Sequence, residues 1–422
     1  MATLLIKNAR VIDPAQYLDK TADILIEDGK IKGIGSFDGA DSVIDADGLI
    51  AAPGLVDMHV HLRDPGQTYK EDIISGCKAA AAGGVTSLLA MPNTAPTVDN
   101  AETVKYILEK AENADAKVYV AASITKGLKS LEPTDLDEVK NAGAVALSDD
   151  GRPVENTKML IEAMKRAPGL GLKITAHCES LPIADGGIMN EGEVSRKLGV
   201  KGIPCAAEDC GAQREIAYAD AIDVPVHICH VSTKNSVKMI RDAKARGVKV
   251  TCETAPHYFS FTEQELLRRD ADYRMNPPLR REDDRREIIK GLADGTIDAI
   301  ATDHAPHAPE EKADFEKAPN GSIGMETSLS AGITNLVMPG YLTINELIRK
   351  MSTNPAEILG INAGSLMDGR PADIVIFDIN ENYIVDVNEL HGKSKNCPFK
   401  TRELYGKVKY TVLDGKVVYR GK

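Results

Sequence analysis

The chain has 422 residues, of which 43% are hydrophobic and 27% are charged. At about 150 residues per domain, this length predicts two to three domains, and the composition excludes a disordered or fibrous protein. Lys and Arg total 51 against 63 Asp and Glu, which gives a formal net charge of −12. An acidic balance argues against a nucleic-acid partner and against an anionic membrane surface. We therefore expect a soluble enzyme.

The sequence contains no segment that resembles a targeting signal or a membrane span. The first residues are interrupted by Lys7, Arg10 and Asp13, which leaves no apolar core for a signal peptide. The longest uncharged stretch, residues 79–98, contains several glycines and prolines and is typical of loops and strands. Seven scattered cysteines do not indicate a disulfide framework. These features predict a cytoplasmic protein.

Both ends of the chain are predicted to form β-strands. Asp28-Gly29 and Asp414-Gly415 each lie between apolar runs, a pattern typical of β-hairpins because the turn needs positive φ angles. Neither end is long enough to form a stable hydrophobic core alone. We therefore expect residues 1–52 and 364–422 to join into one small composite β-sandwich domain.

The middle section, residues 53–363, alternates strand-like and helix-like segments. The expected strands cover residues 55–61, 85–91, 117–122, 144–147, 172–177, 225–230, 248–253 and 298–303. Helical patterns cover residues 69–82, 102–112, 234–245 and 281–293. Eight strands with helical crossovers predict an α/β fold, namely a (β/α)₈ TIM barrel. This barrel is expected to be the catalytic domain. An open doubly wound sheet is the alternative, but no GxGxxG follows the first strand, which disfavours a dinucleotide-binding version.

Polar residues stand at the carboxyl ends of the expected strands, where a barrel builds its active site. They are His59, His61, Asp149, Asp150, His177, His230 and Asp303. Side chains alternate along a strand, so the two histidines of a His-x-His pair project to the same side. Neutral imidazoles that converge with carboxylates suit Zn²⁺ or a similar divalent ion. The pattern therefore predicts a metal site at the barrel mouth.

Strand alternation predicts that some neighbours of these residues face away from the metal. They are His227, His304, Cys178 and Cys229, the two cysteines as small buried hydrophobes. We expect a packing role for His257, after the seventh strand, and no catalytic role for His391, in the C-terminal section.

Several segments carry a family resemblance. Residues 57–66, DMHVHLRDPG, resemble the first dihydroorotase signature of the amidohydrolase superfamily. Residues 301–307, ATDHAPH, with Lys312 beyond them, resemble the second. Residues 91–94 and 274–280 also resemble dihydroorotase segments at the expected positions. The resemblance covers essentially the whole chain and is closest to the class I bacterial enzymes.

The resemblance implies two zinc ions per subunit. His59, His61 and Asp303 would hold the first ion, His177 and His230 the second, and Asp150 and a hydroxide would bridge the two. Many amidohydrolases bridge their metals with a carboxylated lysine, but residues 144–150 contain no lysine. Strand parity cannot choose between Asp149 and Asp150, so the choice of Asp150 rests on the resemblance.

The activity implied is that of a hydrolase acting on cyclic amides, which reversibly cyclises N-carbamoyl-L-aspartate to (S)-dihydroorotate plus water. This is the third step of de novo pyrimidine (UMP) biosynthesis. Asp303 would be the catalytic residue, passing a proton between water and the amide nitrogen. The implied substrate contacts are His61, Arg63, Asn93, Asn276, His307, Asn320 and Gly321. The guanidinium of Arg63 suits the substrate carboxylate, and residues 308–323 could form a mobile loop over the mouth.

Two alternatives stay open at this point. One is another cyclic amidohydrolase, an allantoinase or hydantoinase, although Arg63 and residues 303–307 favour dihydroorotate. The other is a catalytically silent scaffold that associates with aspartate carbamoyltransferase, although every implied ligand is present. Relatives suggest a homodimer, and association with aspartate carbamoyltransferase remains an option for an active enzyme too.

Overall fold

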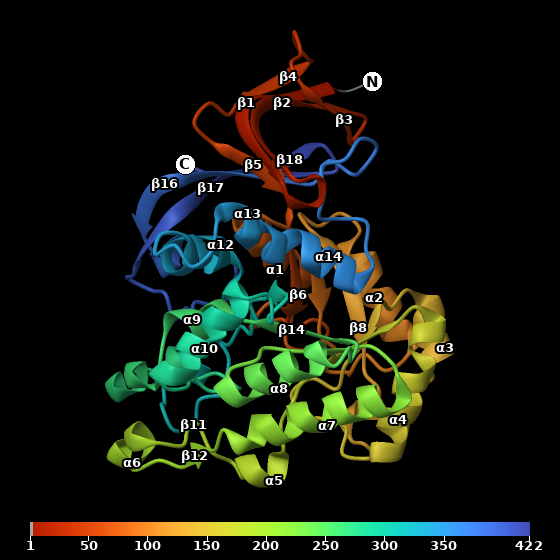
Figure 1. Ribbon diagram of the computed structural model, residues 1–422, viewed down its shortest axis with the longest axis vertical. Coiled ribbons are helices and arrows are strands. Elements are labelled where there is room, and N and C mark those ends of the chain that lie inside the picture. Colours follow the sequence, from red (N-terminus) through yellow and green to blue (C-terminus); the bar gives the residue numbers. More distant parts are fainter. Residues whose placement is uncertain (1–2) are drawn as a thin grey trace.

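The computed structural model describes residues 3–422, and its centre is a barrel of parallel strands (Figure 1). Eight strands pair in chain order: β6 (Leu55–Val60), β7 (Val85–Ala90), β8 (Lys117–Ala122), β9 (Ala146–Leu147), β10 (Lys173–Ala176), β13 (Val226–Ile228), β14 (Val250–Thr254) and β15 (Ala299–Ile300). A parallel bridge between Val60 and His304 joins the last strand end to the first. The predicted (β/α)₈ barrel is confirmed.

Helices cover the outside of the barrel. The longer ones are α1 (Ile73–Ala82), α2 (Ala101–Ala111), α3 (Leu136–Ala142), α4 (Thr157–Arg166), α7 (Ala206–Ile222), α8 (Lys234–Ala245) and α10 (Glu282–Ala293). Several are amphipathic, as is common for covering helices: in α8, Val237, Ile240 and Ala243 are buried in the barrel's main hydrophobic cluster. Within residues 3–422, no helix has both the length and the apolar character needed to cross a membrane.

The remaining elements are shorter. The helices are α5 (Leu181–Ala184), α6 (Glu193–Leu198), α9 (Pro256–Ser260), α11 (Pro309–Lys312), α12 (Ser328–Gly332), α13 (Ile344–Ile348) and α14 (Asn354–Leu359). A two-stranded parallel ribbon, β11 (Met189–Asn190) with β12 (Gly202–Ile203), lies in the long connection between β10 and β13. The ribbon, α5 and α6 lengthen this connection, whereas α12 and α13 pack residues such as Leu329 and Leu347 into the barrel's main hydrophobic cluster.

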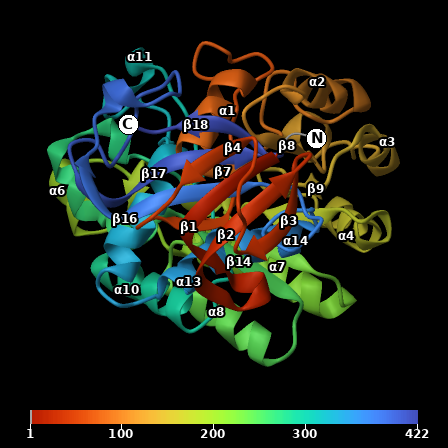
Figure 2. The same ribbon diagram turned by 90° about the horizontal axis from the view of Figure 1, so that it is seen from above.

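Strands from both termini form a second sheet against the barrel (Figure 2). They are β1 (Thr3–Asp13), β2 (Leu18–Glu27), β3 (Lys30–Gly35), β4 (Ser42–Asp45), β5 (Ile50–Pro53), β16 (Ile374–Ile384), β17 (Glu403–Leu413) and β18 (Lys416–Arg420). Antiparallel pairing of β5 with β16 joins the two chain ends. The sequence predicts a sandwich for the terminal strands; the structure has one continuous hydrogen-bonded sheet, which folds around a core of its own.

The first barrel helix begins later than predicted. The pattern predicts a helix from Tyr69, but α1 begins at Ile73 because Asp72 caps it: the Asp72 side chain accepts the Ser75 N–H at 2.8 Å. An N-cap residue has an extended backbone, so the helix cannot pass through it. Lys70 and Glu71 are instead buried and make contacts with distant parts of the chain.

The terminal sheet and the barrel share part of one hydrophobic core. Val375, Phe377 and Val408 of the sheet pack in the same cluster as Leu55 and Val85 of the barrel. The two parts therefore stabilise one another across this contact. The domain boundaries at residues 52/53 and 363/364 stay a prediction.

Phe377 gives a direct measure of that shared core. Its side chain is fully buried, and truncation of a buried phenylalanine costs about 3–5 kcal/mol. We expect Phe377→Ala to lower the free energy of unfolding by that amount in urea denaturation. Ile384→Ala is the matched control, because Ile384 lies on the same strand and is 69% exposed. Equal losses in both variants would contradict the packing described here.

Candidate active site at the barrel mouth

The six side chains predicted to bind metal converge at the carboxyl ends of barrel strands. They lie in or directly after β6, β9, β10, β13 and β15: His59, His61, Asp150, His177, His230 and Asp303. None is more than 6% exposed. The strands of a barrel end at one rim, which is why His61 and Asp303, 242 residues apart, lie in contact.

The histidines of β6 face two different carboxylates. His59 Nε2 lies 3.2 Å from Asp150 Oδ1, and His61 Nε2 lies 3.1 Å from Asp303 Oδ1. Both rings project to the same side of the strand, as alternation predicts. His59, His61 and Asp150 together offer ligand atoms that lie within 4.8 Å of one another.

His177 and His230 form the other half of the cluster. His177 Nδ1 lies 2.9 Å from His230 Nε2 and 3.5 Å from Asp150 Oδ1. With Asp150, these rings form a second group of converging ligand atoms. The Asp150 carboxylate is therefore common to both groups.

Asp149 and Asp150 have different surroundings. The Asp149 carboxylate accepts the N–H groups of Ile124 and Thr125 and the hydroxyl of Thr125, so it holds the loop after β8. Asp150 faces four imidazoles instead. The geometry favours Asp150 as the carboxylate that two ions would share.

The electrostatic environment of the cluster favours bound protons or cations. Burial opposes ionisation of Asp150, but His59, His177 and His230 hold its pKa well below the usual range. Burial likewise disfavours a charged imidazole, yet Asp150 raises the pKa of His59 well above its usual value, and that of His177 to about 10. Despite burial, the hydrogen bond with His61 lowers the pKa of Asp303. Anionic carboxylates surrounded by imidazoles are suited to divalent cations.

Unpaired atoms support the same interpretation. Among residues 3–422, His59 Nε2, Asp150 Oδ1 and His230 Nδ1 are buried without a hydrogen-bond partner. Buried polar atoms normally have one, and metal coordination would satisfy a nitrogen lone pair and a carboxylate oxygen. The donor set present therefore fits a divalent metal.

A small cavity opens beside the cluster. Its volume is about 180 Å³, and its walls include His61, Arg63, Asn93, Asp150, His177, His230, Asn276, Asp303, His307, Asn320 and Gly321. The seven residues predicted to bind substrate thus line the same cavity as four of the other predicted ligands. Gly321 has φ +137°, and a Cβ there would lie 2.7 Å from the Ala305 methyl, so only glycine fits this wall.

Arg63 is a buried cation without a carboxylate partner. It donates from Nε to the Pro306 carbonyl at 3.1 Å, and among residues 3–422 no ion pair within 4.0 Å involves it. The nearby Asp64 carboxylate pairs with Lys110 instead. An anionic group in the cavity would supply the negatively charged partner that Arg63 lacks.

Further polar groups continue this wall. Burial and the charges of Arg63, Lys70 and Lys312 lower the pKa of His307 to about 3, so its imidazole is neutral. His307 Nε2 donates to the Asn320 carbonyl at 2.9 Å. Arg63 therefore supplies the cation of this wall, which lines the same cavity as the cluster residues Asp150 and Asp303.

Asn93 and Asn276 line the cavity but are also engaged by protein groups. Asn93 accepts from His61 Nδ1 at 2.8 Å and donates to Asp150 at 3.2 Å. Asn276 donates to both oxygens of Glu179, which also lies 3.3 Å from His177 Nε2. Both amides thus orient members of the cluster.

Residues 308–323, the expected loop over the mouth, are held by Lys312. Its ammonium donates to the carbonyls of Pro319 and Gly321, each at 2.9 Å. Burial lowers the pKa of Lys312 to about 7. These bonds fix the Asn320-Gly321 segment against the cavity.

Strand alternation gave the wrong direction for two residues of β13 and its end. His227 lies 3.3 Å from Glu253 inside the barrel, and Cys229 lies beside His59, whereas Val226 and Ile228 pack toward the outer helices. His230 reaches the mouth because its φ of +36° turns the chain out of the strand pattern. Asp303 has a similar conformation, with φ +49°.

Other residues lie where the pattern predicts. Cys178 belongs to the main hydrophobic cluster, and His304 accepts the Gly324 N–H through Nδ1, away from the cluster. His391 pairs with Glu326 at the surface. His257 is buried, and burial lowers its pKa to about 4.

Sequence reasoning missed three buried charged residues that support the site: Lys70, Glu179 and Glu253. Glu253 stands at the end of an expected strand, which was the available signal. Although burial opposes it, His227 and His59 lower the pKa of Glu253 to about 2. Lys70 lies in the turn before α1, where the sequence predicts helix instead, and Glu179 lies in the loop after β10, where no periodicity marks it.

A barrel with this cluster at its mouth defines an amidohydrolase, and comparison with known proteins agrees. Residues 48–236 match the family model described as Dihydro-orotase-like, and residues 236–419 match the Amidohydrolase family. The chain belongs to the dihydroorotase family of the amidohydrolases.

Relatives cover the chain from end to end. It is 51% identical to a dihydroorotase of Geobacter metallireducens and 49% identical to one of Acetivibrio thermocellus, with 99% of each chain covered. Among solved structures, it is similar to the L-hydantoinase (dihydropyrimidinase) of Arthrobacter aurescens, with a TM-score of 0.89, 26% identity, and coverage of 100% of this chain and 97% of that one. The dihydropyrimidinase of Brevibacillus agri gives a TM-score of 0.86 at 26% identity, covering 99% and 95%.

The two adjacent aspartates provide a test of the metal site. Asp150→Asn removes a charge from the centre of the cluster, and we expect its zinc affinity to fall by more than about 100-fold, beyond the range for residues that only support a ligand. Asp149→Asn, the matched control, should lose stability but keep its metal. Metal analysis after dialysis decides this; loss in Asp149→Asn alone would mean that the other carboxylate is the ligand.

Proposed function

We propose that this protein is a dihydroorotase that reversibly cyclises N-carbamoyl-L-aspartate to (S)-dihydroorotate plus water, the third step of pyrimidine biosynthesis. The observation that carries the proposal is the small cavity between an imidazole–carboxylate cluster and a cationic wall. Such a cavity suits a small cyclic amide that bears a carboxylate. Identity of about 50% to curated dihydroorotases over the full chain supports the same activity.

The proposal includes two zinc ions. His59, His61 and Asp303 would hold one, His177 and His230 the other, and Asp150 would be shared. Bound divalent ions polarise an amide carbonyl and lower the pKa of water, which neutral imidazoles and carboxylates cannot do alone. The unpaired atoms of His59, Asp150 and His230 support this ligand set.

Asp303 is proposed to carry the proton. Its carboxylate lies at the cavity wall, 3.1 Å from His61 Nε2, and its lowered pKa keeps it ionised at neutral pH. An ionised carboxylate accepts a proton from the attacking water and returns it to the leaving amide nitrogen. In ring closure the same group acts in the opposite order.

The cationic wall is proposed to bind the rest of the substrate. Arg63 would donate two hydrogen bonds to the substrate carboxylate in a bidentate contact. Asn93 and His307 lie beside it, and Asn276 and the Asn320-Gly321 segment would contact the ring. His61, at the edge of the cluster, completes the predicted contacts.

Other assignments are weaker on this evidence. The solved hydantoinase and dihydropyrimidinase structures share the fold at 26% identity, whereas the unpaired Arg63 favours a substrate with a carboxylate. A silent scaffold has no need to keep six converging ligands buried together.

The deciding experiment is an assay of metal-loaded protein with dihydroorotate, N-carbamoyl-L-aspartate, allantoin and hydantoins. We expect turnover of the first two alone. Preference for allantoin or a hydantoin would assign a different cyclic amidohydrolase, and no turnover despite bound metal would favour the scaffold.

We further propose a cytoplasmic location, supported by seven free cysteines, which suit a reducing compartment. A homodimer and association with aspartate carbamoyltransferase stay predictions.

Arg63 is expected to determine selectivity. Truncating one member of a desolvated charge pair costs about 2–5 kcal/mol, so Arg63→Met should lower kcat/KM for dihydroorotate about 30-fold to several thousand-fold. Arg63→Lys keeps the positive charge but cannot make the bidentate contact, so its kcat/KM should lie between those of Arg63→Met and the unaltered protein. Metal content should not change, and a neutral cyclic imide should be hydrolysed nearly as before. Equal losses on both substrates would indicate an arginine that supports the fold.

A further inference from the structure

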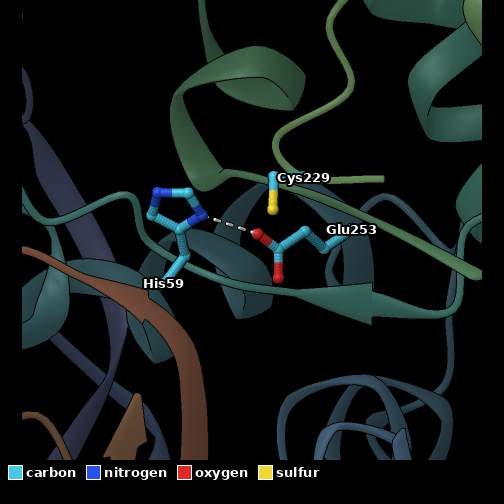
Figure 3. A group of neighbouring side chains, drawn as sticks. All are labelled: His59, Cys229 and Glu253. Atoms are coloured by element: carbon cyan, nitrogen blue, oxygen red, sulfur yellow. Dashed lines mark hydrogen bonds and ion pairs between the residues drawn. The ribbon is translucent and has the colours of Figure 1, made fainter. Parts of the chain in front are cut away.

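The His59 ring is held between two carboxylates. Its Nε2 lies 3.2 Å from Asp150 Oδ1. Its Nδ1 lies 3.2 Å from Glu253 Oε1, the contact drawn in Figure 3. Glu253 belongs to β14 and is 1% exposed. A neutral imidazole carries one proton, and a proton donated from Nδ1 to Glu253 leaves the Nε2 lone pair directed at the metal cluster.

Glu253 is itself held from its other side. Its Oε2 lies 3.3 Å from His227 Nε2, and His227 Nδ1 lies 2.8 Å from the Thr251 hydroxyl. His227 and Thr251 are direct partners in the pairing of β13 with β14, so the barrel frame sets their positions.

One proton arrangement is consistent with all these contacts. The Thr251 hydroxyl donates to His227 Nδ1, His227 Nε2–H points at Glu253, and His59 Nδ1–H donates to Glu253. Both rings are then neutral, and the His59 Nε2 lone pair is directed toward the mouth, where it has no hydrogen-bond partner among residues 3–422. His227 Nε2 and Glu253 Oε2 are in contact at 3.3 Å, although neither atom has an aligned hydrogen bond.

We propose that Glu253, backed by His227, is a positioning residue that fixes the tautomer and orientation of His59, so that Nε2 is preorganised to bind metal. The inference rests on the metal-dependent function proposed above. Carboxylates that receive the second N–H of a ligating histidine orient the ring and raise its basicity. Asn93 stands in the corresponding place for His61.

Cys229 raises one competing possibility. Its sulfur lies with His59 and Glu253 in a group whose ligand atoms are within 4.8 Å of one another (Figure 3). An ion held there would need His59 Nδ1 without its proton, and His59 would have to serve two metals at once. The contacts from Thr251 through His227 to Glu253 favour a protonated Nδ1 instead.

Zinc affinity, measured by competition with a chromophoric chelator, tests the proposal. Glu253→Gln should weaken zinc binding about 10- to 100-fold, the range for residues that orient a ligand. Glu263→Gln is the matched control: Glu263 is also buried, but it pairs with Asn190, and its zinc affinity should not change. A merely structural Glu253 would lower the melting temperature of the metal-free protein and leave zinc affinity intact, which would overturn the proposal.

His227 gives a second pair of variants if Glu253→Gln fails to fold. His227→Leu removes the N–H that faces Glu253 and should weaken zinc binding about tenfold, whereas His227→Gln keeps an N–H near that position and should restore most of the affinity. Equal affinity in both variants and in the unaltered protein would overturn the proposal.

Two further variants separate the possible failures. His59→Gln must lose zinc if His59 is a ligand; unchanged affinity would overturn this proposal and the proposed metal centre together. Loss in His59→Gln but not in Glu253→Gln would overturn the positioning role alone. Cys229→Ser should leave zinc stoichiometry unchanged, and loss of one bound ion would assign the group to a metal instead.

Discussion

The buried carboxylate of Asp150 is the charge on which the rest of the site depends. It lies within 4 Å of four imidazoles, contributed by strands β6, β10 and β13. A buried anion is costly unless compensated, so the surrounding histidines must converge on it. That requirement explains why this end of the barrel carries so many titratable groups with so little exposure.

Supporting residues make the convergence precise. Three of the four rings that face the cluster also have a polar partner on their other side: Glu253 for His59, Asn93 for His61, and Glu179 for His177. Such contacts restrict rotation of a ring before any ligand binds, which reduces the entropy lost on binding. The partners come from three different parts of the chain.

The cavity has two faces of opposite charge. The cluster supplies carboxylates, and the wall that contains Arg63 supplies a cation beside the neutral His307. In a small buried cavity the charges are poorly screened, so a substrate must match both faces. A metal ion would balance the first face, and an anionic substrate group the second.

The sequence alone determined the features that depend on local periodicity and on turn chemistry. Alternating apolar residues predict the barrel strands, the paired Asp-Gly turns predict the terminal hairpins, and the spacing of His59 and His61 places both rings on one side of β6. These properties depend on backbone geometry within a few residues. The family motifs then added the candidate site residues by resemblance.

Tertiary structure alone separates Asp150 from Asp149 and turns His227 and Cys229 inward. Alternation holds only while the backbone stays extended, and the left-handed conformations at His230 and Asp303 break it where the chain leaves a strand. Glu253 and Lys70 acquire their contacts from partners more than a hundred residues away. The direction of a side chain at a strand end is set by the loop that follows and by those distant partners, neither of which local sequence specifies.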